Sequence, residues 1–467
     1  MRLRTSVPLA AIHSKPSYIA AACARQRNEQ SHSGRHTGAE RPREPKTRTR
    51  SAGRRALRDF APLGLVLCAL SLSCHTSRSP FDYVMFQDIA PKSLTLTQSW
   101  NAIGLDDRDR VYIIWTSRRE DGREDSALFR YARSTGRREF LGTFIDVAAA
   151  QHNLRPGEEI PKGHTRIIQV GRKLYMASQG FHDFKAGIES LPSYRGAHLF
   201  TYDLDTGSFD DVTRTRPGGV WVEHQGVVTL SYSPEYGLLI GLTHPLGELV
   251  LYDVARGETR KIVPGIPWQR DHVVSREILV TRTGKVYTYR GAEDPSLRDT
   301  TNEVWAYDIA RDQNKPTGQR LKGGFWNGQA QTRDRNTIYV STVSGELYAL
   351  HVANGRFEHL GYFIDRASFD EPQRVRVKYL YGIALTKAET ELIGVPILNA
   401  SAGGLVSAPQ STLISYDIAS HTFKRRGDVS IAVFTGSEHR DRAGNIYMAA
   451  FDWDTNCRLA ILPASRL

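Results

Sequence analysis

A short motif recurs seven times along the chain and constrains the fold more than any other feature of the sequence. Each copy is a pair of apolar or aromatic residues that opens a strand directly after a polar turn. The copies are Val111-Tyr112, Leu174-Tyr175, Leu238-Leu239, Val286-Tyr287, Ile338-Tyr339, Leu392-Ile393 and Ile446-Tyr447. Their second members are 63, 64, 48, 52, 54 and 54 residues apart. Repetition at such a period indicates an array of similar supersecondary units.

A second motif follows the first in most units and indicates how many strands each unit holds. It reads Tyr202-Asp203, Tyr252-Asp253, Tyr307-Asp308 and Tyr416-Asp417, and in most copies a polar or Gly-containing turn and another strand come next. Four strands in a unit of about 50 residues are typical of a propeller blade. The sequence therefore predicts an all-β, seven-bladed β-propeller over residues 93–467. We interpret the tyrosines as packing between blades and the aspartates as acceptors for turn amides.

A propeller closes when a strand from one end of the chain completes the blade at the other end. Two early segments have the composition of such a strand, Tyr83–Asp88 and Leu94–Gln98. The sequence leaves both open.

Positive charge is concentrated at the N-terminus. The chain has 62 Lys and Arg against 50 Asp and Glu, a net charge of +12. Residues 1–60 hold 14 of the basic and 4 of the acidic residues, so the rest of the chain has a net charge of only +2. Residues 1–53 are polar and basic without apolar periodicity, which predicts a disordered leader. Because the basic run is not part of the propeller, we expect no nucleic-acid partner.

Residues 54–74 have the pattern of an export signal. Three arginines precede the apolar run Ala61–Leu70, which is short for a membrane span and suits a signal peptide. A small residue then precedes Cys74, as at a lipoprotein cleavage site, although Ser71 stands where a Leu is usual. We expect lipidation at Cys74, a linker over 75–92, and a protein anchored by its lipid in the periplasm or at the cell surface. Ordinary cleavage and an uncleaved anchor are the alternatives.

Candidate site residues gather where the inner strands begin. The innermost strand of each blade starts at one mouth of the central channel. Asn101, His164 and Arg276 stand eleven residues before the marker tyrosines of their blades, and His224 and His439 stand near the equivalent points of two others. These positions are far apart in the chain but are predicted to converge.

More polar residues follow the second strands, which end at the same mouth. They are His182, His244, Tyr289 and Arg290. Neutral histidine can bind a divalent metal or move a proton, and arginine binds carboxylates. Such groups suit β-elimination of a uronate polysaccharide, which needs a cation for the C6 carboxylate, a base for the C5 proton and an acid for the leaving oxygen.

Two segments resemble blades of seven-bladed polysaccharide lyases such as the ulvan lyases. They are Gly163–Ile167 with Lys173–Tyr175 and Phe181–Asp183, and Gly241–Gly247 leading to Tyr252-Asp253. The resemblance implies a His/Tyr/Arg site in which His164 and His182 match the paired histidines. From the blade positions and the resemblance together, we expect His164, His182, His224 and Tyr289 as catalytic groups, and Arg166, His244, Arg276, Tyr287, Arg290, Asn101 and His439 as substrate-binding groups. Val227-Val228 stands where the family has its catalytic Tyr.

Three functional classes remain open. The first is a lyase acting on acidic polysaccharide, in which histidines could hold a divalent metal. The second is a non-catalytic surface propeller that binds a glycan or another extracellular ligand. The third is a metal-dependent hydrolase or lactonase, which usually needs acidic or amide ligands at the pore; Asn101 and Asn327 are present but few acids converge there.

Overall fold

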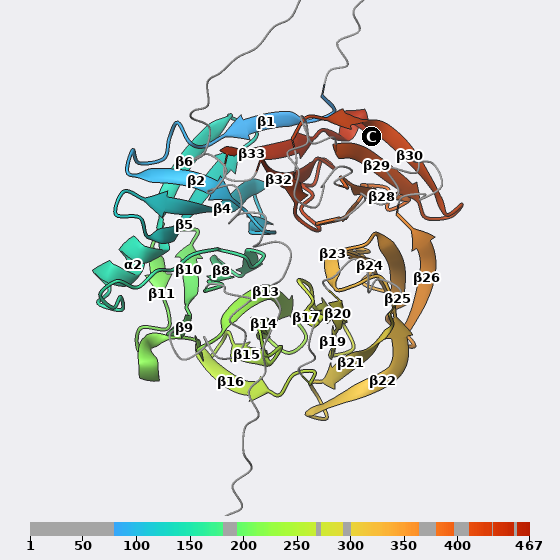
Figure 1. Cartoon of the computed structure of the whole chain (residues 1–467), viewed down its shortest axis with the longest axis horizontal. Helices are drawn as coiled ribbons and strands as arrows, with labels where there is room; N and C mark the ends of the chain where they lie inside the picture. Colours follow the sequence, from blue (N-terminus) through green and yellow to red (C-terminus); the bar gives the residue numbers. More distant parts are fainter. Residues whose placement is uncertain are drawn as a thin grey trace, which may run out of the picture. The chain divides into compact units, whose positions relative to one another are not determined.

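The computed structural model describes residues 79–180, 194–267, 272–292, 300–363, 380–396, 411–431, 433–452 and 455–467. Within them, antiparallel sheets stand side by side around a central axis as the seven blades of a β-propeller (Figure 1). The predicted signal peptide and Cys74 lie outside the described residues.

Blades 1 to 3 come from the first half of the described chain. In blade 1 the inner strand is interrupted: β2 (Leu94–Gln98) and β3 (Ile103–Leu105) both pair with β4 (Arg110–Arg119), and β5 (Glu124–Ala132) and β6 (Arg137–Thr143) follow. Blade 2 holds β7 (Ile168–Val170), β8 (Lys173–Ala177), β10 (Leu199–Asp203) and β11 (Phe209–Asp211). Blade 3 holds β13 (Gly226–Ser233), β14 (Leu238–His244), β15 (Leu249–Asp253) and β16 (Glu258–Val263). Short strands β9 (Gly196–Ala197) and β12 (Val222–Glu223) pair with each other ahead of β10 and β13.

Blades 4 to 7 complete the ring. Blade 4 has an inner strand built from β17 (His272–Val274) and β18 (Leu279–Val280), a second strand built from β19 (Lys285–Thr288) and β20 (Arg290–Ala292), then β21 (Asn302–Asp308) and β22 (Gln313–Leu321). Blade 5 holds β23 (Trp326–Gln331), β24 (Thr337–Thr342), β25 (Glu346–His351) and β26 (Arg356–Tyr362). Blade 6 holds β27 (Ala384–Leu385), β28 (Glu391–Gly394), β29 (Ser411–Asp417) and β30 (Thr422–Val429). Blade 7 holds β31 (Val433–Thr435), β32 (Ile446–Asp452) and β33 (Thr455–Leu462).

The N-terminal strand β1 (Asp82–Met85) closes the ring as the outer strand of blade 7. It pairs antiparallel with β33, Asp82 opposite Ile461 and Met85 opposite Arg458. Of the two segments left open by the sequence, the earlier one therefore supplies the closing strand, while Leu94–Gln98 is the inner strand of blade 1. Strand β1 falls within the range 75–92 that was expected to be a linker.

The seven marker pairs occupy equivalent places, because each lies in the second strand of its blade. The Tyr-Asp motifs end third strands, as the Asp203 turn illustrates. Tyr202 is buried, and the Asp203 carboxylate accepts hydrogen bonds from the backbone amides of Asp205 and Thr206 at 3.0 and 2.9 Å. The seven-bladed, all-β prediction is confirmed.

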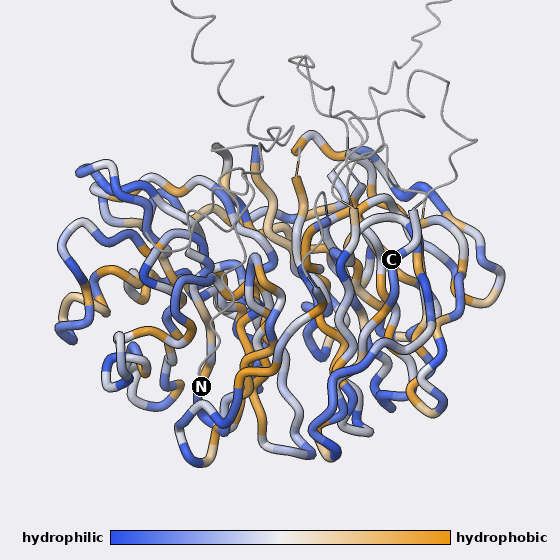
Figure 2. Tube along the Cα trace, turned by 60° about the horizontal axis from the view of Figure 1, so that its bottom comes forward, coloured by the Kyte–Doolittle hydropathy of each residue, from blue (hydrophilic) through white to orange (hydrophobic). Residues whose placement is uncertain are grey.

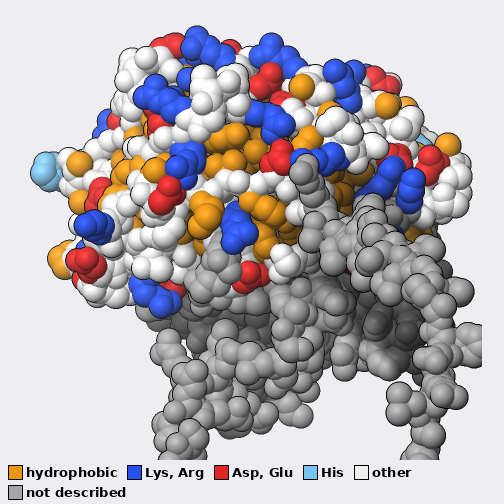
Figure 3. Space-filling model, turned by 90° about the horizontal axis from the view of Figure 1, so that it is seen from above, with side chains coloured by type: hydrophobic (Ala, Val, Ile, Leu, Met, Phe, Trp, Pro, Cys, Tyr) orange, Lys and Arg blue, Asp and Glu red, His pale blue; other side chains and the backbone are white. Residues whose placement is uncertain are grey.

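Apolar side chains fill the spaces between neighbouring blades. One cluster joins Ile113 and Phe129 of blade 1 to Tyr447 and Leu459 of blade 7, so the two ends of the chain share a core. In Figure 2 the hydrophobic stretches run within the strands and the hydrophilic ones gather in the connections. Acidic and basic side chains are interspersed over the described surface visible in Figure 3, in keeping with the small net charge of the propeller.

A short α-helix, α2 (Phe144–Ala150), follows blade 1 and was not predicted from the sequence. The hydroxyl of Thr143 accepts a hydrogen bond from the Asp146 amide and caps it. In the part of the chain that the structure describes, no helix is long and apolar enough to cross a bilayer.

Candidate functional site

The candidate site lies where inner strands begin and second strands end, which is one face of the ring because the strands are antiparallel. We call it the inner-strand rim and define it by Lys162, His164, His244, Arg276 and Arg290. His164 precedes β7, and Arg276 lies in the break between β17 and β18. His244 ends β14, and Arg290 lies in β20, the last part of the second strand of blade 4. Three consecutive blades therefore supply this set.

His164 is bonded on both ring nitrogens. Its Nδ1 lies 3.0 Å from the Val228 carbonyl oxygen, and Arg276 Nη1 donates to its Nε2 at 3.2 Å. Because a carbonyl only accepts and a guanidinium only donates, His164 must carry its proton on Nδ1. Burial and the charges of Arg276 and Lys162 hold its pKa well below the usual value, so the ring is neutral. His164 is therefore built to orient Arg276 across three blades.

Two contacts with described residues help to hold the Arg276 side chain. One is the bond to the neutral His164, and the other places the guanidinium carbon 5.7 Å from the centre of the Phe325 ring. Its backbone amide also donates to the Trp326 carbonyl at 2.8 Å, which fixes the break in the inner strand of blade 4 against blade 5. Arg276 therefore brings a half-buried guanidinium to the rim.

His244 lies in a positive environment at the end of β14. Burial lowers its pKa well below the usual value, and the charges of Arg276, Arg290 and Lys162 lower it further. The side chain is only partly covered. It is therefore a neutral imidazole at neutral pH, in reach of solvent and surrounded by three cations.

Arg290 is the most buried of the rim cations. Its guanidinium donates to the carbonyl oxygens of His272, Pro245 and Leu246 at 3.1 to 3.2 Å. Burial lowers its pKa to about 10, so it stays protonated at neutral pH. It ties the connection after β14 to the start of blade 4 and adds positive charge beneath His244.

The central channel is crossed by hydrogen bonds that meet at Glu277. Its carboxyl oxygens accept from Asn101 Nδ2 at 2.9 Å and from Gln329 Nε2 at 2.8 Å. The Asn101 amide oxygen in turn accepts from the Ser437 amide at 3.0 Å, so blades 1, 4, 5 and 7 are joined. Burial raises the pKa of Glu277 to about 7, although Arg166, 4.0 Å away, opposes that rise. We call Asn101, Glu277, Gln329 and Ser437 the channel network.

Arg166 and His439 lie beside this network rather than among the rim residues defined above. Arg166 forms an ion pair with Glu438 at 2.8 Å. His439 is buried, its pKa is lowered well below the usual value by burial and by the charge of Arg166, and its Nε2 has no hydrogen-bond partner among the described residues.

Other residues expected at the mouth have different places. The exposed ring of His224 lies with Nδ1 2.8 Å from the Tyr194 carbonyl oxygen, and no contact within the described chain joins it to His164 or His244. Tyr289 is buried between blades, donates to the Leu321 carbonyl at 2.7 Å and stacks on Trp326. Tyr287 lines a separate pocket. His182 lies outside the described residues.

Sequence reasoning missed Glu277, Gln329 and Lys162. The available signal was adjacency to the positions eleven residues before the marker tyrosines. Glu277 follows Arg276, Gln329 follows Gly328, which has this offset from Tyr339, and Lys162 stands two residues before His164. Among the described residues, no group of three or more His, Cys, Asp or Glu could hold a metal ion.

Comparison with known proteins gave no family model and no curated protein that matches. Solved structures match at low identity. A chain of the mitotic checkpoint complex has a TM-score of 0.49 and 10% identity, covering 89% of this chain and 99% of that one. The Myceliophteria thermophila Cps50 (Swd1) β-propeller domain has a TM-score of 0.49 and 11% identity, covering 82% and 99%. An oligogalacturonate lyase in complex with manganese has a TM-score of 0.41 and 11% identity, covering 63% and 72%. Such identities assign no role to any residue of this chain.

Proposed function

We propose that the inner-strand rim binds an acidic polysaccharide containing uronate and that it cleaves this ligand by β-elimination. The supporting observation is the electrostatic setting of His244, a partly exposed neutral imidazole on which Arg276, Arg290 and Lys162 all act. Clustered cations on one face attract anionic ligands and raise their local concentration.

In this proposal Arg276 binds the sugar carboxylate. A guanidinium offers two parallel N–H donors that match the two carboxylate oxygens, and such paired bonds are stronger than neutral ones. The bond to the neutral His164 uses one N–H of Arg276 but does not neutralise the charge of the guanidinium. His164 is a positioning residue here, because both of its nitrogens are already bonded.

His244 is the base of the proposed reaction. It takes the C5 proton, the C5–H electrons form the C4–C5 double bond, and the C4–O bond breaks. The leaving oxygen takes a proton from water, and the hydroxide so formed takes the proton from His244, which returns to its neutral form. The neighbouring cations stabilise the negative charge that develops on the carboxylate as the proton leaves. The low pKa of His244 keeps it unprotonated and available for this step at neutral pH.

Binding without cleavage is the second candidate. The place of Tyr289 favours it, because this expected catalytic group is buried and its hydroxyl donates to the Leu321 carbonyl instead of reaching the rim. His244 would then contribute to binding only. Under either candidate we propose export through residues 54–74 and anchoring by lipid at Cys74.

One experiment separates the candidates. The processed protein is incubated with a panel of uronate polysaccharides and one neutral polysaccharide, and binding and the ultraviolet absorbance of the unsaturated product are measured separately. Binding and product support the lyase, and binding alone supports the second candidate. Failure to bind any acidic polymer refutes both.

Variants assign the roles. Arg276→Gln is expected to weaken binding, and His244→Gln is expected to slow product formation by about 10²–10⁴-fold while binding persists, the usual effect of losing a proton-transfer group. Arg256→Gln, an exposed arginine in the turn after β15, is the control and should leave both measurements unchanged.

A further inference from the structure

Blades 1 and 6 each bring an aromatic side chain to the level at which the inner strands begin. Trp100 lies in the break between β2 and β3, and Tyr381 precedes β27. Each stands twelve residues before the second member of its marker pair, Tyr112 and Ile393 respectively. The corresponding residues of blades 2, 4, 5 and 7 are Gly163, Ser275, Asn327 and Thr435. Among these six blades, only blades 1 and 6 have an aromatic residue at this position.

The inner strand of blade 7 lies between the two aromatic residues. Its Thr435 is bonded on both sides, because the hydroxyl donates to the Ser99 carbonyl of blade 1 at 2.8 Å and the backbone forms a parallel bridge with Tyr381 of blade 6. The rings of Trp100 and Tyr381 meet edge to face, with their centres 5.3 Å apart. We call Trp100 and Tyr381 the aromatic shelf.

The shelf is held in place by the core and is still partly exposed. The Trp100 ring also meets Phe451 of β32 edge to face at 5.3 Å, and its indole N–H donates to the side-chain oxygen of Gln98. Both shelf residues pack against the core that joins blades 1 and 7, but neither is fully buried. A ring fixed in this way loses little conformational freedom when a ligand binds to it.

His164 connects the shelf to the rim. The rings of Trp100 and His164 are nearly parallel, with 8° between their planes and 6.4 Å between their centres. The other contact of the His164 ring edge is the bond that Nε2 accepts from Arg276. The shelf therefore lies one side chain away from the Arg276 guanidinium. Blades 2 to 4 supply the cations of this face, and blades 6 and 1 supply its exposed aromatic rings.

This division matches the two chemical faces of a uronate chain. Each unit of such a chain carries a carboxylate, and its pyranose ring presents a face of C–H groups. The faces of aromatic rings carry partial negative charge and attract weakly positive hydrogens, while contact also buries apolar area. A simple anion would use only the cations, whereas a uronate chain uses both halves.

We infer that the aromatic shelf is a second sugar-binding subsite, which stacks the unit adjacent to the one whose carboxylate binds Arg276. This inference rests on the function proposed for the rim and deepens it. The ligand of the rim is then a chain of at least two units, and a single uronate fills only the part at Arg276.

The test compares affinities for single units and for chains. Galacturonate, glucuronate and the tetramers prepared from polygalacturonate and glucuronan are titrated by calorimetry, in the His244→Gln background so that cleavage is slow. Trp100→Leu keeps an apolar side chain beside Phe451 but removes the ring face. It should weaken tetramer binding about five- to twentyfold, the loss expected for one stacked ring, and leave the affinity for the single units within about twofold. Arg276→Gln should weaken binding of both.

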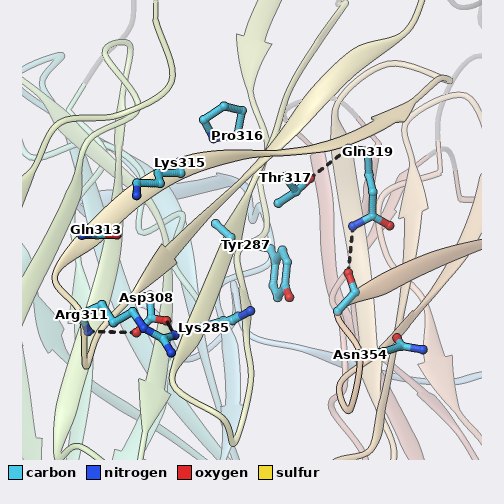
Figure 4. A pocket seen from close by; sticks show the side chains of 12 residues that line it. Lys285, Tyr287, Asp308, Arg311, Gln313, Lys315, Pro316, Thr317, Gln319 and Asn354 are labelled. Atoms are coloured by element: carbon cyan, nitrogen blue, oxygen red, sulfur yellow. Dashed lines mark hydrogen bonds and ion pairs between the residues drawn. The ribbon is translucent and has the colours of Figure 1, made fainter.

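Tyr381→Leu is the second shelf variant and should also weaken tetramer binding selectively. Trp305→Leu is the matched control, because Trp305 is a partly exposed tryptophan in β21. Lys315→Gln removes one charge as Arg276→Gln does, but in a pocket between blades 4 and 5 that Lys285 lines where the second strand of blade 4 starts, away from the rim (Figure 4). Both controls should leave all affinities unchanged.

The outcomes separate the shelf from the rim. If Arg276→Gln weakens binding but both folded shelf variants bind tetramers as well as their parent does, the inference is wrong and the function proposed for the rim stands. An equal loss for single units and tetramers in Trp100→Leu also overturns it, because Trp100 would then act through His164 and Arg276. If no uronate binds even without the shelf substitutions, the proposed function fails and the shelf fails with it.

Discussion

Glu277 should make the propeller less stable as pH rises, and Glu277→Gln should remove this effect. The carboxyl is fully buried in the channel network, and burial raises its pKa from the ordinary 4.5 to about 7. Between these values the folded state holds a proton that the unfolded state has released. The free energy of unfolding therefore falls as pH rises from about 4.5 to about 7 and stays low above that range.

The magnitude follows from the two pKa values. At 1.36 kcal/mol per pKa unit, a rise from 4.5 to about 7 corresponds to about 3 kcal/mol of stability lost between pH 4.5 and pH 8. Glutamine keeps the shape and one acceptor oxygen. A flip of the Gln329 amide lets its oxygen accept from the new side-chain amide.

The assay is urea unfolding of wild type and Glu277→Gln at several pH values from 5 to 8. The difference between the two proteins isolates Glu277 from other titrating groups. The variant should gain stability relative to wild type by about 3 kcal/mol across this range. If the two curves run parallel with pH, Glu277 does not titrate in the folded protein and the reasoning is refuted.

Three further outcomes are expected. Cys74→Ala should release the processed protein from the membrane fraction; retention after a high-salt wash contradicts the lipid anchor. Tyr289→Phe should lower the free energy of unfolding by about 1 kcal/mol, because the hydrogen bond to the Leu321 carbonyl is lost, and should leave ligand binding unchanged. A loss of turnover without a loss of stability would instead show that Tyr289 belongs to the functional site. Burial opposes protonation of His198, but hydrogen bonds with Asp211 and Glu158 outweigh it and raise its pKa. The stability this gives is present below pH 6.5 and lost as pH rises through the folded pKa, so His198→Gln should be most destabilising near pH 6.

The repeat made the fold predictable because each copy depends only on residues close together in the chain. Each marker pair, such as Val111-Tyr112, must bury its side chains between blades, and seven pairs at near-regular spacing leave few alternatives to a propeller. The closing strand was left open because Asp82–Met85 pairs with β33, more than 370 residues away in the chain, and nothing local in its sequence records that pairing.

The site was less predictable for a related reason. Alignment of the blades placed His164 and Arg276 at the starts of inner strands, and the structure brings these two side chains into contact. The same alignment could not tell which way a side chain points when strands are interrupted. Tyr289 lies in such a break, between β19 and β20, and its side chain is buried in the core.

The break in the inner strand of blade 4 also links the rim to the channel. Arg276 and Glu277 are consecutive and point in opposite directions, Arg276 to His164 and Glu277 to Asn101 and Gln329. The hydrogen bonds that fix Glu277 in the channel therefore also fix the adjacent backbone, from which the Arg276 side chain reaches the rim.

Glu277→Ala tests this link, because it leaves the buried side-chain amides of Asn101 and Gln329 without the carboxylate that accepts their hydrogen bonds. Each such group costs about 1–3 kcal/mol, so the variant should lose several kcal/mol of stability at pH 5. Its affinity for the acidic polysaccharide should also fall, although Glu277 lies outside the rim. Glu277→Gln keeps an acceptor and should keep the affinity. If Glu277→Ala binds as well as wild type under conditions where both are folded, the channel network does not position Arg276.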